Sequence, residues 1–80
     1  MTINEVFKTR DLAEASTLLT LKQKLIRLEH DGHRFWFFFA DNKDRCIKLS
    51  EMYWAGELKV DPREFSLKMR ELKDRLHGQQ

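Results

Sequence analysis

The amino-acid sequence predicts a single small α+β domain over residues 1–80, with an ordered core from about residue 6 to residue 77. Three observations predict this fold class: hydrophobic alternation on both sides of an Asp-Gly pair, three stretches with helical periodicity, and short connections between them. The expected order is β-α-β-β-α-α, a small three-stranded sheet with an antiparallel hairpin and with helices packed mainly on one face. A right-handed crossover would place the first strand beside the third.

The first strand is predicted over residues 6–8, and the first helix from about Arg10 to about Lys22. Thr9 is the expected N-cap, because its hydroxyl can accept from the free amides of the first helical turn. The helix is indicated by side chains that recur at helical spacing, namely Leu12, Ala15, Ser16, Leu19 and Gln23.

The central hairpin is the most informative segment, with arms at residues 25–30 and 33–39. Asp31-Gly32 is the expected two-residue turn, and such a turn fixes the register so that Arg27 faces Trp36. One face is then entirely apolar and should lie against the helices: Ile26, Leu28, Phe35, Phe37 and Phe39. The other face should carry Leu25, Arg27, Glu29, Arg34, Trp36 and Phe38, with an ion pair between Glu29 and Arg34.

Two further helices complete the predicted fold. Asp41 is the expected N-cap of the second helix, and Gly56 should end it with positive φ. Its core stripe consists of Cys46, Leu49, Ser50 and Tyr53. Asp61 and Pro62 then give a strong start signal for the third helix. The apolar face of this last helix is Phe65, Met69, Leu72 and Leu76.

Composition excludes several classes of protein. Cys46 is the only cysteine, so neither an intramolecular disulfide nor a cysteine-rich zinc site can form, and we expect the reducing cytoplasm. No apolar stretch is long enough to cross a membrane. The 15 basic and 13 acidic residues are interleaved, which indicates a mixed solvated surface rather than that of a dedicated duplex-DNA binder.

Several segments together resemble a known group of proteins. They are residues 7–12, 34–41 and 53–58, followed by the helix that contains Phe65 and Leu72-Lys73. The pattern is similar to that of a family of small uncharacterised bacterial proteins, classed only as a domain of unknown function. The resemblance covers residues 7–76 and implies a self-contained bacterial or mobile-element domain. It implies no catalytic or cofactor-binding residue.

No catalytic apparatus is predicted. Cys46 lies on the core stripe of a helix, where free cysteines are usually inert. His30 and His33 flank the turn and should face each other, but two imidazoles are too few ligands for a metal site. The three glycines do not form a phosphate-binding loop. We therefore expect no enzyme activity, no cofactor and no metal.

The unusual surface is the second face of the predicted sheet, where Trp36 and Phe38 project beside Arg27 and Arg34. We expect a non-enzymatic binding module that meets a protein partner, or a second copy as a homodimer, through a Leu25/Trp36/Phe38 face. The alternative is a single-stranded nucleic-acid binder that stacks bases on the two aromatic rings and contacts phosphates with the two arginines. In a third interpretation, the last helix or the C-terminal tail covers this face and makes it ordinary core.

Overall fold

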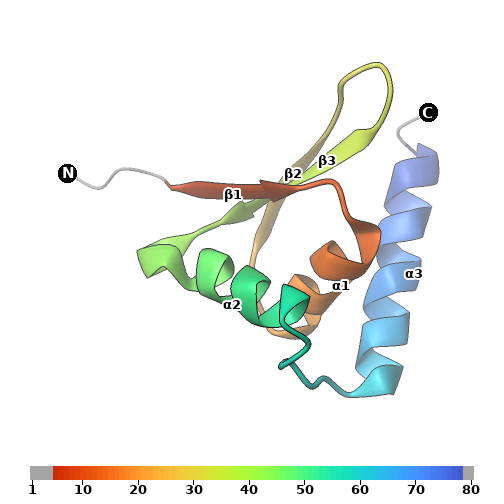
Figure 1. The fold of residues 1–80 in the computed structure, drawn as a ribbon. Helices are drawn as coiled ribbons and strands as arrows, with labels where there is room; N and C mark the ends of the chain where they lie inside the picture. The colour runs from red at the N-terminus through yellow and green to blue at the C-terminus, as the bar shows by residue number, and fades with distance from the viewer. Residues whose placement is uncertain (1–4, 79–80) are drawn as a thin grey trace.

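The structure, a computed structural model, describes residues 5–78 and has the predicted α+β fold (Figure 1). Its elements are β1 (Val6–Thr9), α1 (Leu12–Thr20), β2 (Leu25–His30), β3 (Phe35–Ala40), a short 3-10 turn η1 (Asn42–Asp44), α2 (Arg45–Trp54) and α3 (Pro62–Gly78). The order β-α-β-β-α-α is therefore confirmed.

The three strands form one sheet in the order β1-β3-β2, and both neighbouring pairs are antiparallel. β1 lies beside β3, as the sequence predicts. β1 and β2 consequently run parallel to each other on either side of β3, and α1 connects them. Figure 1 shows α1 and α2 on one side of the strands, with α3 running alongside α1.

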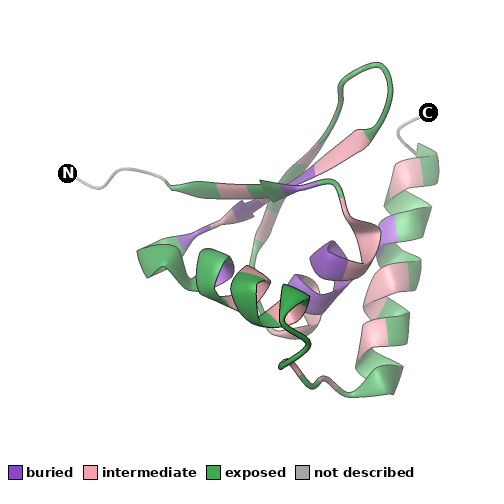
Figure 2. Ribbon diagram, viewed as in Figure 1, coloured by how far each residue is buried: buried purple, intermediate pink, exposed green. Residues whose placement is uncertain are grey.

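The hydrophobic core lies between the helices and one face of the sheet. Its fully buried members come from β3 and from all three helices: Ala15, Leu18, Phe37, Phe39, Cys46 and Leu72. Figure 2 shows the buried segments gathered on α1 and β3. Leu72 of α3 joins this cluster, so the interpretation in which the third helix covers the second sheet face is not realised.

The β2–β3 hairpin turns one residue later than predicted. The Asp31 amide donates to the Arg34 carbonyl at 3.1 Å, which makes Gly32 and His33 the centre of the turn. Gly32 has a φ of 98°, whereas Asp31 lacks the positive φ that its predicted place would need. The cause is the Asp31 side chain, whose Oδ1 accepts from the amides of His33 and Arg34 at 2.9 Å each. The cross-strand pairing therefore shifts by two residues. Because this number is even, each side chain stays on the face of the sheet that was predicted for it near the turn.

A β-bulge between Leu25 and Arg27 corrects the predicted orientation of two side chains. Leu25 pairs with the buried Phe39 and packs against the core, so its predicted place on the opposite face is wrong. Ile26, predicted in the core, is 42% exposed. A bulge adds one residue to a strand, and the inward-outward alternation is therefore inverted on its far side.

α1 begins and ends inside its predicted limits. Asp11, not Thr9, is the N-cap, and its Oδ1 accepts from the Glu14 amide at 2.8 Å. Thr9 supports this cap from two positions before it, because its hydroxyl accepts from the Asp11 amide at 3.1 Å. The helix stops at Thr20, and Lys22 then adopts a left-handed φ of 70°.

A buried polar cluster joins β1, α1 and α2. The Glu14 carboxylate is only 3% exposed, and each of its oxygens accepts a hydrogen bond. Thr9 Oγ1 donates to Oε1 at 2.7 Å, and Ser50 Oγ donates to Oε2. A buried charge destabilises a protein unless it is hydrogen-bonded, so these two hydroxyls make the burial of Glu14 tolerable.

The second helix starts later than predicted: α2 begins at Arg45 after η1, with Asp44 and not Asp41 at its N-cap, whereas the predicted end of α2 and start of α3 are confirmed. Asp41 is buried, and its Oδ1 accepts from the Cys46 amide at 2.7 Å in the first turn of α2. Gly56 has a φ of 75°, the conformation expected after a helix. α3 begins at Pro62, directly after Asp61, as the start signal predicts.

Candidate binding face

The sheet face opposite the core carries side chains from all three strands. Lys8 of β1 and Arg27 of β2 both pair with Phe38 of β3. Trp36 lies two residues before Phe38, hence on the same side, and Glu29 is opposite Trp36. We call this surface the open face and define it as Val6, Lys8, Arg27, Glu29, Trp36 and Phe38. Its two aromatic rings are partly exposed and lie outside the core cluster.

Each aromatic ring of the open face has a cation over it. The Arg27 guanidinium lies 4.2 Å from the centre of the Phe38 ring. Over Trp36, the Lys8 Nζ lies at 5.1 Å and the Arg10 guanidinium at 5.9 Å. The predicted pair of Arg27 with Trp36 is wrong, because the register shift moves Arg27 opposite Phe38. Such contacts are worth about 0.5–1 kcal/mol at exposed sites, so a ligand can displace these cations.

The ion pair on this face also differs from the prediction. Arg27 Nε pairs with Glu29 of its own strand, and both side chains are about half exposed (49% and 51%). Arg34, the predicted partner of Glu29, lies exposed in the turn opposite Asp31. Exposed pairs contribute at most about 1 kcal/mol, so Arg27 remains available to an incoming anion.

The Trp36 ring is oriented by Asp31. Its Nε1–H donates to Asp31 Oδ2 at 2.9 Å, while Oδ1 binds the turn amides. The indole bond, followed by the amides of Arg34 and His33, holds the pKa of the Asp31 carboxyl well below its usual range. The polar edge of the indole is thus satisfied within the hairpin, and its apolar face is left for contacts.

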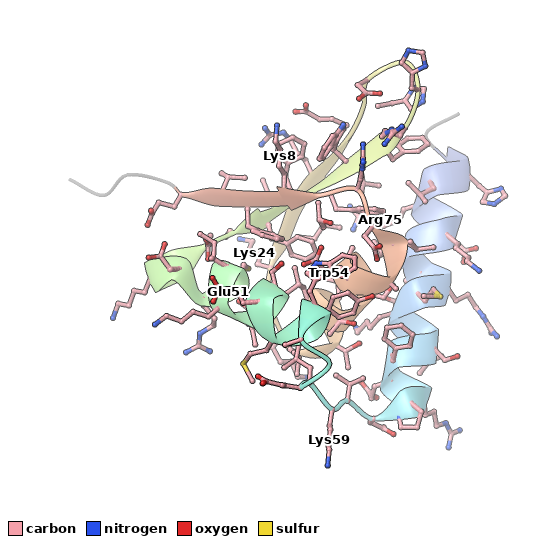
Figure 3. The ribbon with its side chains drawn as sticks, viewed as in Figure 1. Lys8, Lys24, Glu51, Trp54, Lys59 and Arg75 are labelled. Carbon is pink, nitrogen blue, oxygen red and sulfur yellow. The ribbon has the colours of Figure 1, made fainter. Side chains whose placement is uncertain are left out.

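A pocket of about 720 Å³ adjoins Trp36 where β1 leads into α1. Its walls combine two indoles with basic and polar side chains: Lys8, Thr9, Arg10, Asp11, His33, Arg34, Trp36 and Trp54. Figure 3 shows Lys8 on one side of β1 and Trp54 on the other, near the end of α2. Trp54 is 65% exposed. This lining suits a ligand that combines planar rings with negative charge.

The other reactive side chains do not assemble into a site. His30 pairs with Phe35, with ring centres 4.6 Å apart, so the expectation that it faces His33 is wrong. Within residues 5–78, no group of three His, Cys, Asp or Glu side chains could hold a metal ion. Burial, and next the charge of Asp41, raises the pKa of the buried Cys46 thiol to about 11. This thiol is therefore protonated at neutral pH.

The five side chains predicted as a binding site have different locations. Arg27, Trp36 and Phe38 lie together on the open face. Arg34 lies beside that face, in the wall of the adjoining pocket. Leu25 does not belong to the site, because the bulge turns it toward the core.

Sequence reasoning missed three contributors to this surface, Lys8, Arg10 and Trp54. For Lys8 a signal exists: once β1 is placed beside β3, strand alternation puts it on the side of Phe38. Arg10 and Trp54 lie outside the strands, and no periodicity in the sequence brings them to Trp36.

Comparison of the chain with protein-family models, with curated proteins and with solved structures finds no significant match. The resemblance to a family of small bacterial proteins therefore stays a prediction. None of the helices in the described range, residues 5–78, has the length and apolar character required to span a bilayer.

Proposed function

We propose that this protein is a non-enzymatic binding module whose open face takes single-stranded nucleic acid. The observation that carries the proposal is the combination of each exposed ring with cations: Phe38 with Arg27, and Trp36 with Lys8 and Arg10. Unpaired bases stack on exposed aromatic rings whatever their sequence, and adjacent Lys and Arg side chains contact the phosphates.

The energetics favour an exchange of partners on these rings. Stacking of one base on an aromatic side chain is worth about 1–3 kcal/mol, more than the exposed cation–π contact that it replaces. The displaced cations have long, flexible side chains, which can turn from the ring to the neighbouring phosphates. A strand therefore supplies both interactions at once, since it presents planar bases and a regular series of anions.

The positive charge of the open face favours a nucleic-acid strand over a protein partner. A typical protein interface is depleted of Lys and Glu relative to the rest of the surface, whereas Lys8 and Glu29 flank the two rings of the open face on the edge strands β1 and β2. The acidic side chains nearby are already engaged: Glu29 by Arg27, Asp31 by Trp36, and Asp11 of the adjoining pocket by the Glu14 amide. The remaining positive charge is therefore directed to a ligand.

The test is fluorescence titration with a random-sequence single-stranded oligonucleotide. Trp54→Phe is the parent variant, so that Trp36 is the only indole and reports on its own surroundings. We expect quenching that weakens as salt is added, because phosphate contacts release counterions. Phe38→Ala in this background should weaken binding by about tenfold, the equivalent of one lost stacking contact.

A matched pair of charge variants makes the titration specific. Lys8→Ala with Arg27→Ala removes two cations from the open face, and Lys59→Ala with Lys73→Ala removes two exposed cations elsewhere. We expect the first pair to weaken binding and to reduce its salt dependence far more than the second. Equal losses in both pairs, or no quenching at low salt, would show that the open face does not bind the strand.

A protein partner, including a second copy of the chain, is the second candidate for the same face. The 44% exposure of Val6 favours it, because this side chain extends the apolar strip beyond Phe38. Light scattering at increasing protein concentration tests self-association. A monomer at all concentrations opposes it, and a dimer that Phe38→Ala dissociates would support it.

We place this activity in the reducing cytoplasm of a bacterium. The support for a reducing compartment is that the single cysteine is buried as a free thiol and forms no cross-link. The bacterial origin follows from the resemblance alone.

A further inference from the structure

A second pocket lies at the other end of β3, away from the hairpin turn. Its volume is about 690 Å³, within the range of small-molecule sites. Five of its lining side chains are basic: Lys22, Lys24, Lys43, Arg45 and Lys48. They come from the α1–β2 connection, from η1 and from α2, and the Lys24 carbonyl is tied to this end of the sheet by the Ala40 amide at 2.9 Å. None of the described residues in the lining is acidic.

The positive charge of this pocket is not compensated by the protein. The two ion pairs within residues 5–78 are Arg27–Glu29 and Lys68–Glu71, and neither involves the pocket. Asp44, which lies between Lys43 and Arg45 along the chain, is exposed and belongs to neither ion pair, and the buried Asp41 already accepts from the Cys46 amide. The whole protein has a formal net charge of only +2, so five cations around one pocket are a strong local concentration.

Two of these lysines have a left-handed backbone conformation, as has Asp44 beside the second of them. Lys22 (φ 70°) and Lys43 (φ 56°) are both left-handed, a conformation that glycine adopts without strain. Lys22 occupies the position after α1 where glycine is usual. Its amide donates to the Leu19 carbonyl and the next amide, of Gln23, donates to Leu18, which is the Schellman pattern. Strain of this kind persists where a side chain has a function.

We propose that this pocket binds a compact polyphosphate group, either inorganic or carried by a nucleotide. A single phosphate has a charge of about −1.5 to −2 and would leave most of the five cations unpaired, whereas a chain of three phosphates neutralises most of them. Lys and Arg side chains form charge-assisted hydrogen bonds to phosphate oxygens. The described lining contains no aromatic side chain, so the pocket recognises the phosphates and not a base. This site is separate from the open face and does not depend on the function proposed for that face.

The test is calorimetric titration of the whole chain at neutral pH and low salt with tripolyphosphate, orthophosphate and ATP. We expect tripolyphosphate to bind at least about tenfold more tightly than orthophosphate, since it engages more cations. ATP with the same affinity as tripolyphosphate would identify the phosphates alone as the determinant. Tighter binding of ATP would identify a nucleotide as the natural source. No heat with tripolyphosphate at low salt would overturn the proposal.

Three variants locate the site. Lys43→Ala with Lys48→Ala should weaken tripolyphosphate binding by about tenfold or more, because each lysine donates to a charged acceptor. The control pair Lys59→Ala with Lys73→Ala removes the same charge outside the pocket and should change the affinity much less. Trp36→Ala should leave the affinity unchanged, so a failure of this proposal is distinguishable from a failure of the open face.

The variant Lys22→Gly tests the contribution of the Lys22 charge to binding separately from the effect of this residue on stability. Glycine fits the left-handed position after α1, so we expect this variant to melt a few degrees higher while it binds tripolyphosphate more weakly. A more stable variant with unchanged affinity would show that Lys22 has no part in the site. Equal losses in the pocket pair and the control pair would overturn the proposal as a whole.

Discussion

The buried carboxylate of Glu14 gives the sharpest test of how this fold is held together. It accepts from Thr9 of β1 and from Ser50 of α2, and it is 3% exposed. Hydrogen bonds to a charged group contribute about 1.5–3 kcal/mol each. Glu14→Gln keeps the shape of the side chain but replaces one charged acceptor by an amide. We therefore expect a loss of about 1–2 kcal/mol of unfolding free energy.

That loss is large for a protein of this size. A chain of 80 residues is stable by about 4–12 kcal/mol, and about 1 kcal/mol changes the melting temperature by about 4–8 °C. Glu14→Gln should thus melt about 5–15 °C lower, measured by circular dichroism. Glu14→Ala removes both bonds and leaves the buried hydroxyl of Thr9 and the partly buried hydroxyl of Ser50 without this acceptor, at a loss of about 3–5 kcal/mol. The conservative variant is the more informative one, because it remains folded.

The control is Glu51→Gln, which removes the same charge from an exposed position on α2 (Figure 3). We expect it to change the unfolding free energy by less than about 0.5 kcal/mol. If Glu14→Gln proves as stable as the parent, or more stable, then the cost of desolvating the charge equals or exceeds the gain from its hydrogen bonds. The polar cluster would then not stabilise the contact between β1, α1 and α2.

The remaining predictions concern two titratable groups. Because burial raises the pKa of Cys46 to about 11, we expect a thiol reagent to modify the native protein very slowly. The urea-unfolded chain should react at the rate of a free thiol. Fast labelling of the native protein would contradict the packing of α2. The pKa of the Asp31 carboxyl is lower in the folded state than in the unfolded state, where it is near 3.9. The ionised carboxylate therefore stabilises the fold fully at neutral pH, and this stabilisation is lost as the pH falls through the folded-state pKa. Urea unfolding should therefore show the largest difference in unfolding free energy between the parent and Asp31→Asn near pH 7, and a smaller difference in acid. A difference that does not depend on pH would refute the role of the hydrogen bonds from the indole and the amides to Asp31.

Local signals account for most of what the sequence predicts correctly. Helix starts and stops depend on one or two neighbouring residues, so Pro62 and Gly56 could be assigned without any tertiary information. The strands could be placed because a mixed segment and a continuous aromatic run, each of six residues, flank a turn signal. The start of α1 was misplaced by two residues because Thr9 and Asp11 are both good caps, and the choice between them depends on Glu14.

The hairpin register required information that a turn signal does not contain. Gly32 has the predicted positive φ, but the Asp31 carboxylate binds the following amides and moves the turn by one residue. The resulting shift is even, and for this reason Trp36 and Phe38 were assigned to the correct face although their cross-strand partners were not. An odd shift would have exchanged core and surface along the whole arm.

The bulge and the cations around Trp36 could not be predicted for a different reason. A bulge has no reliable sequence signal, so the inward turn of Leu25 emerges only from the pairing with Phe39. Lys8 and Arg10 reach Trp36 because β1, distant in sequence, pairs with β3. Contacts of this kind follow from topology, and single-sequence periodicity does not specify strand order.

The central position of β3 has a consequence for how this protein can change over generations. Phe37 and Phe39 serve the core, while Trp36 and Phe38, interleaved with them, serve the open face. Under the proposed function, selection for foldability acts on every second residue of one strand, and selection for the ligand acts on the residues between. Descendants of this chain can acquire a new ligand by substitutions at the even-numbered positions alone, with the fold inherited intact.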